Sequence, residues 1–207
     1  MVTASLPEAR FALVRDRVME GVAELLTAGV DLTFAQVAKA AGVPERTVYR
    51  HFPTREALLA EVFAWANRRI GFDGQLPATG AAAGALVRRV FPGFDAIAPV
   101  IRELLVAPGG RLARLSDKAE RQRAFTGVVK HEAPGLGRHA ERHVAAALQL
   151  LTAAATWQAL RDYWDMDGME AAEAAALAIE LLLEGARART ARPAPRSHPG
   201  AARARKT

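Results

Sequence analysis

The sequence contains no cysteine among its 207 residues. This absence excludes a disulfide framework, a thiolate zinc site and a cysteine nucleophile. The chain also lacks the run of about 20 apolar residues that a membrane-spanning helix needs, because its most apolar stretch, 144–160, is interrupted by glutamine and threonine. Residues 1–20 carry several charged side chains, so they have no apolar signal-peptide core. We therefore expect a cytoplasmic protein without a membrane partner.

Acidic residues are fewer than basic ones, 22 against 28, which gives a formal net charge of +6. Seven of the basic residues lie within 187–207, where there is no Asp or Glu, so the rest of the chain holds 21 basic and 22 acidic residues. Residues 191–207 also lack apolar periodicity, which predicts a disordered basic tail. A surface for DNA must therefore come from local charge rather than from the total.

Alternating apolar and polar residues, which would indicate β-strands, are also missing, so an all-α fold is expected. Apolar residues recur every three or four positions, as in Phe11, Val14 and Val18, and this spacing predicts helices. About nine helices are expected: one at 8–28, two short ones after Thr33 and from Pro44, and others at 54–70, 81–91, 94–106, 111–131, 138–164 and 168–188.

Local signals predict where several of these helices begin or end. Thr33 with Gln36, and Asp167 with Glu170, have the spacing of a capping box, and Thr54 is expected to cap the helix that follows it. Residues 71–80 are rich in glycine and small residues and predict a loop. Pro92 is expected to separate two helices, as are the clusters of proline and glycine at 108–110 and 134–137.

The segment 33–58, TFAQVAKAAGVPERTVYRHFPTREAL, predicts a functional site. Two short helices joined by a turn at Gly42 form a helix-turn-helix, whose second helix can enter the major groove of DNA. The stretch 39–55 has four basic residues against Glu45 alone. This local charge of +3 favours binding to a phosphate backbone.

The residues VAKAAGV at 37–43 and TVYRHFPTREAL at 47–58 closely resemble the DNA-binding domain of TetR-family transcriptional regulators. The resemblance extends over 8–65 and implies backbone contacts from Thr33, Tyr49, His51 and Arg55, with base contacts from the start of the second short helix. Including the local charge, the candidate DNA-binding residues are Thr33, Lys39, Pro44, Glu45, Arg46, Thr47, Tyr49, Arg50, His51 and Arg55.

The resemblance also implies a division of the chain. Residues 1–53 would form the helix-turn-helix domain, with the motif itself at about 33–52. Residues 54–190 would form a helical domain for ligand binding and dimerisation, with 54–70 as the connecting helix. The family pattern is not matched at every position, since Pro44 and Arg46 replace a frequent serine and glycine. Arg46 could contact guanine, and the operator sequence is not implied.

Several aromatic residues fall on apolar faces of the predicted helices, where core packing is the simplest interpretation of each. Together they permit an apolar pocket of about 300–1,000 Å³, and the resemblance implies a small apolar effector there. The candidate ligand-binding residues are Trp65, Phe91, Phe94, Phe125, Trp157 and Tyr163. The two long C-terminal helices are rich in alanine and leucine, and the resemblance implies that they form a homodimer interface.

No arrangement of residues typical of catalysis is present, so an enzyme is not expected. His139 and His143 are four residues apart, but Glu141 between them does not fit the zincin order, so we predict neither a metal nor a cofactor. The sequence predicts a nucleoid-associated, ligand-responsive repressor that binds a palindromic, double-stranded DNA operator as a homodimer. The alternative is a helical small-molecule-binding or interaction protein that retains the fold without specific DNA binding.

Overall fold

A computed structural model describes residues 6–191, and over this range it contains helices and no strands. The all-α prediction is confirmed, although the described residues form eleven helices rather than about nine. The predicted basic tail, 191–207, lies outside the described residues except for its first residue, which belongs to the last helix. The helices are α1 (Leu6–Thr27), α2 (Phe34–Ala41), α3 (Glu45–His51), α4 (Arg55–Arg69), α5 (Gly80–Ala96), α6 (Ala98–Val106), α7 (Pro108–Leu115), α8 (Lys118–Glu132), α9 (Arg138–Leu151), α10 (Ala154–Trp164) and α11 (Gly168–Ala191).

The prediction that Pro92 separates two helices is wrong, because α5 continues through it to Ala96. Proline removes one helical hydrogen bond, but the tertiary packing around it is extensive. Phe91 and Phe94 are buried on either side. Gly93 lies so close to the preceding loop that a Cβ there would be 2.8 Å from the Cα of Ile70. This packing keeps α5 continuous despite the proline.

Two predicted helices are each divided in the structure. The 111–131 stretch becomes α7 and α8, and the 138–164 stretch becomes α9 and α10. At the second division, the Thr152 hydroxyl donates to the Gln149 carbonyl at 2.9 Å, and the Thr156 hydroxyl donates to the Leu150 carbonyl at 2.6 Å. Such local side-chain bonds compete with the helical pattern. They account for the break between α9 and α10, where the sequence has no glycine or proline.

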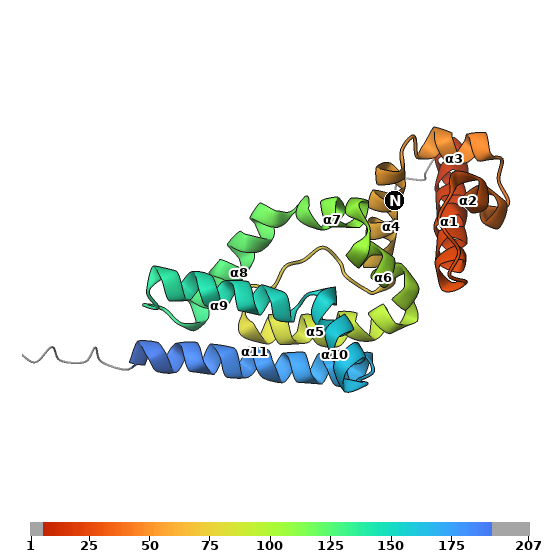
Figure 1. Ribbon diagram of the computed structural model, residues 1–207. Coiled ribbons are helices and arrows are strands. Elements are labelled where there is room, and N and C mark those ends of the chain that lie inside the picture. The colour runs from red at the N-terminus through yellow and green to blue at the C-terminus, as the bar shows by residue number, and fades with distance from the viewer. Residues whose placement is uncertain (1–5, 192–207) are drawn as a thin grey trace, which may run out of the picture.

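Helices α1–α3 lie together at one end of the molecule, and α4 leads from them into the larger helical body (Figure 1). In that body α11 makes its most extensive contact with α5, and the two run side by side (Figure 1). One cluster of buried apolar side chains continues from the N-terminal helices through α4 into the body. No helix among the described residues is both long and apolar enough to span a membrane.

Candidate nucleic-acid interface

Helices α2 and α3 are joined by the turn that the sequence predicted. The Thr33 hydroxyl accepts a hydrogen bond from the Gln36 amide at 3.2 Å and donates to its side-chain oxygen at 2.8 Å, so the predicted capping residues begin α2. Gly42 ends it with φ of 64° and ψ of 34°, a left-handed conformation that glycine adopts without strain. The chain then enters α3 after Pro44, which makes no side-chain cap.

The inner side of this pair of helices is held by small and β-branched residues. Val37 and Val48 are fully buried, and Phe52 after α3 is almost so. Gly21 in α1 faces α2 so closely that a Cβ there would be 2.9 Å from the Ala41 amide nitrogen. This close crossing fixes α2 against α1, and α3, with Val48 buried, packs against α2.

Most of the predicted DNA-binding side chains lie on the outer side of the same helices. Thr47 is half-buried, beside the buried Val48. The Tyr49 ring stacks on Phe34 with centroids 4.4 Å apart and planes at 6°, which orients its exposed hydroxyl end. The exposed candidates are Thr33, Lys39, Pro44, Glu45, Arg46, Tyr49, Arg50 and Arg55.

His51 differs from these residues because it is half-buried. Its ring stacks on Phe11 with centroids 4.1 Å apart, and its Nδ1 is buried without a hydrogen-bond partner among the described residues. Burial, and then the nearby charges of Arg50 and Arg15, lower the pKa of His51 below its usual 6.5. The folded protein therefore favours the neutral imidazole.

Arg55 is exposed but is already engaged in contacts. Its guanidinium donates to the Leu32 carbonyl at 2.5 Å and lies 3.5 Å from a carboxylate oxygen of Glu103 in α6. It therefore connects the loop before α2 to the helical body. Sequence reasoning missed Glu103, because a partner 48 residues away leaves no local signal.

The structure brings only two of the six predicted ligand-binding residues to one apolar cavity in the helical body. Phe94 and Phe125 line a mostly apolar cavity of about 160 Å³, to which α4, α5, α6, α7, α8 and α9 contribute. Phe91 and Trp157 are fully buried in the core outside it. Trp65 is half-buried against the core, and Tyr163 is 82% exposed.

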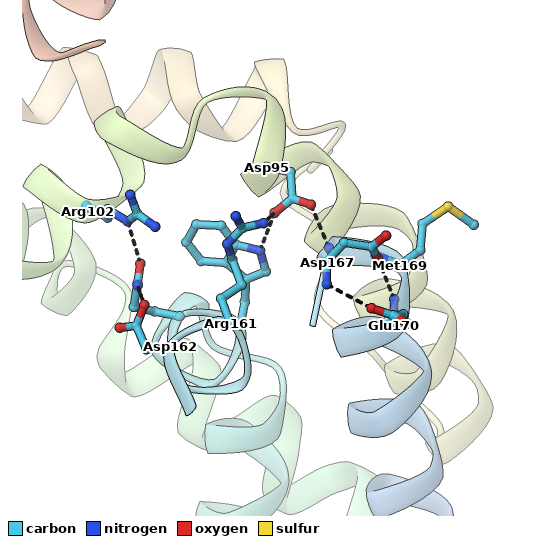
Figure 2. Close-up of polar contacts among 10 residues, drawn as sticks. Asp95, Arg102, Arg161, Asp162, Asp167, Met169 and Glu170 are labelled. Atoms are coloured by element: carbon cyan, nitrogen blue, oxygen red, sulfur yellow. Dashed lines mark hydrogen bonds and ion pairs between the residues drawn. The ribbon is translucent and has the colours of Figure 1, made fainter. Parts of the chain in front are cut away.

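Trp157 has a structural role in a polar cluster around Asp95 (Figure 2). Its indole nitrogen donates to one Asp95 oxygen at 2.9 Å, and Arg161 pairs with the same oxygen. The Gly168 amide at the start of α11 donates to the other oxygen at 2.6 Å. Asp95 thus joins α5 to α10 and α11.

The histidine pair considered as a metal site is exposed. His139 and His143 lie on the surface of α9, and Glu141 is 3.8 Å from the ammonium of Lys130. Over residues 6–191, no three His, Asp or Glu side chains come together in a way that could hold a metal ion.

The geometry of α2 and α3, with one buried side and one basic outer side, is that of a helix-turn-helix, a motif whose second helix can enter the major groove of DNA. Residues 20–62 match the family model for bacterial regulatory proteins of the TetR family. This match covers 43 of the 207 residues, so the chain is similar to that family over its helix-turn-helix segment.

The structure is also similar to that of a TetR transcriptional regulator from Rhodococcus sp. RHA1. The two sequences are 22% identical, the match covers 86% of this chain and 98% of that chain, and the TM-score is 0.43. No curated protein matches the sequence.

Proposed function

We propose that this chain is a transcriptional regulator of the TetR family, and that it is a ligand-responsive repressor that binds a palindromic operator as a homodimer, in the cytoplasm at the nucleoid. The observation that carries the proposal is the outer side of α3. Arg46, Tyr49 and Arg50 are exposed there, while Val48 is buried on the opposite side. A short helix anchored in this way can present its donors to the major groove, where arginine pairs with guanine.

The outer side of α11 supports the homodimer. The side that packs on α5 is lined by alanine, Ile179 and Leu183, but Leu177 and Leu181 on the opposite side are 56% and 57% exposed. A helix that is apolar on both sides is normally covered on both. On the neighbouring α10, Tyr163 and Trp164 are exposed as well. A second copy of the chain would cover this surface as a four-helix bundle.

A dimer also suits the length of the recognition element. One helix contacts only a few base pairs, so two copies related by two-fold symmetry bind two half-sites separated by whole turns of DNA. The proposed operator is therefore a palindrome. Lys39 and Thr33 would contact the phosphates beside each half-site.

The position of the cavity supports a response to a ligand. Phe63, Ala66 and Asn67 of α4 line it, and α4 follows directly after α3. One turn earlier on the same side of α4, Gly109 of α7 is so close that a Cβ would be 2.8 Å from the Leu59 side chain. A ligand that displaced α4 by differential binding would shift α3, and a coupling of about 1–3 kcal/mol would change operator occupancy severalfold.

The DNA-binding part is tested by mobility-shift titration of the full chain with fragments from its own promoter region. We expect a palindrome-specific complex whose affinity falls with salt. Arg46→Ala and Arg50→Ala should each weaken it by about 10- to 100-fold, since a lost base or phosphate contact costs about 1–3 kcal/mol.

Arg123→Ala is the matched control, because Arg123 is equally exposed but lies on α8. This variant should bind the fragment as the wild type does. Unchanged affinity in both α3 variants would contradict the proposal. It would favour a helical small-molecule-binding or interaction protein that keeps the fold without specific DNA binding.

A further inference from the structure

The cavity beside α4 combines an apolar body with two cationic groups. Arg114 of α7 and Arg121 of α8 are among its lining residues, and no described Asp or Glu lines it. We propose that the effector is a small apolar molecule bearing a carboxylate, bound with that carboxylate at Arg114 and Arg121. This inference rests on the ligand response proposed above and adds the chemical class of the ligand.

The charge of Arg114 is not paired with a carboxylate within residues 6–191. Its guanidinium donates instead to the carbonyls of Leu104 and Leu105 near the end of α6, the latter at 3.2 Å. Carbonyls at a helix C-terminus carry only partial negative charge. A guanidinium has five donor N–H groups, so these two bonds leave Arg114 with donors for a ligand.

Burial adds to this imbalance of charge. The pKa of Arg114 is lowered first by partial burial and then by repulsion from Arg111 and Arg121. The positive charges of Arg111 and Arg121, which disfavour the Arg114 cation, favour an anion at the same place. A ligand carboxylate would therefore be attracted to this end of the cavity.

Arg121 has one acidic neighbour, which pairs with it weakly. Its nitrogen is 3.8 Å from an oxygen of Asp117, one helical turn earlier, and the Asp117 side chain is 52% exposed. Ion pairs with an exposed partner contribute little. Arg121 also borders a second depression that includes Asp117 and Glu120, so it lies where the apolar cavity meets the surface.

The remaining wall of the cavity limits the apolar part of the ligand. Phe94, Phe125 and Leu86 contribute to it, and its volume is about 160 Å³. An apolar cavity of about 150 Å³ can hold a benzene-sized molecule. A compact aromatic or short aliphatic acid fits both the volume and the charge, whereas an organic cation would be repelled.

The test compares acids with their neutral amides, which have nearly the same shape. Binding of phenylacetate and phenylacetamide, and of hexanoate and hexanamide, is measured by calorimetry on the full chain. We expect at least one acid to bind about tenfold more tightly than its amide, as a desolvated charge-assisted bond allows. Arg121→Gln should reduce this preference to within about threefold, and raised salt should reduce it in the wild type.

Arg123→Gln, an exposed arginine on the same helix, should keep the full preference for the acid. Equal binding of acid and amide, failure of both acids to bind, or an unchanged preference in Arg121→Gln would overturn the inference. A parallel mobility-shift assay separates it from the proposed function. Specific DNA binding without acid preference overturns only the ligand class, whereas acid preference without specific DNA binding overturns only the repressor.

Discussion

The fold lowers the proton affinity of His51, which has a consequence for stability. The unfolded chain takes up a proton near the usual pKa of 6.5, whereas the folded chain does so only at lower pH. The contribution of neutral His51 is therefore complete above pH 6.5 and is lost as the pH falls below it.

We expect the melting temperature of the wild type to fall between pH 8 and pH 5.5 by more than that of His51→Gln, because glutamine does not titrate in this range. Comparing the two pH slopes removes the constant effect of losing the stacking on Phe11. Identical slopes would show that His51 is not responsible.

Asp165 is the only non-glycine residue among those described that has positive φ, at 54°. It ends α10, and its amide donates to the Arg161 carbonyl at 3.2 Å. A left-handed conformation costs most residues about 1–2 kcal/mol, and glycine avoids this cost.

Asp165→Gly is therefore expected to increase the free energy of unfolding by about 0.5 kcal/mol after the added freedom of the unfolded chain is subtracted. Asp162→Gly, within the same helix, should decrease it by a similar amount. Urea denaturation at constant m-value measures both changes. A loss of stability in Asp165→Gly would contradict the explanation.

At the scale of the helices, capping can be compared at two aspartates. Asp167 accepts bonds from the amides of Met169 at 2.8 Å and Glu170 at 2.9 Å, and Glu170 accepts from the Asp167 amide at 3.1 Å. Figure 2 shows these residues at the start of α11. Asp117 stands at the equivalent place before α8 but makes no side-chain cap.

Asp167→Ala should lower the free energy of unfolding by about 1 kcal/mol, the usual value of an N-cap. Asp117→Ala should lower it by only a few tenths, because its exposed pairing with Arg121 is weak. Chemical denaturation of the two variants gives the comparison. Equal losses would mean that the capping box does not stabilise α11.

These caps could be predicted because the atoms that form them lie within three residues of one another. Thr33, Thr54 and Asp167 all begin the helices that the sequence predicted for them. The continuity of α5 through Pro92 could not be predicted, since it depends on packing against Ile70. The division of α9 from α10 depends on weak local bonds that compete with a good helical sequence.

The same difference applies to the candidate sites. The exposed side of α2 and α3 follows from a continuous motif, so its residues could be selected from the sequence. The cavity takes its walls from several helices far apart in the chain. A prediction from aromatic residues alone therefore included Phe94 and Phe125, which line the cavity, and also Trp157, which hydrogen-bonds to Asp95 in the core. It gave no reason to include Arg114, which also lines the cavity.

At the scale of the whole molecule, the proposed dimer predicts the effect of charge on α11. Leu181→Glu places a carboxylate on the outer apolar side and should convert a particle of twice 22.2 kDa to one of 22.2 kDa in light scattering after gel filtration. Because burial of an unpaired charge is costly, the dissociation constant should rise at least about 100-fold.

Leu112→Glu is the matched control, since Leu112 on α7 is 59% exposed against 57% for Leu181. This variant should remain dimeric, and both should keep the helical circular dichroism of the wild type. A dimer that survives Leu181→Glu would exclude the outer side of α11 as the interface.

If the exposed leucines of α11 form the proposed dimer interface, protein abundance also affects regulation. In the proposed dimer, association follows mass action, so the share of paired chains rises with the number of copies in the cell. Two-fold pairing makes operator occupancy depend on roughly the square of that number while most chains are single. A cell that halves its supply of the regulator would thus lose more than half of its repression, even with the effector unchanged.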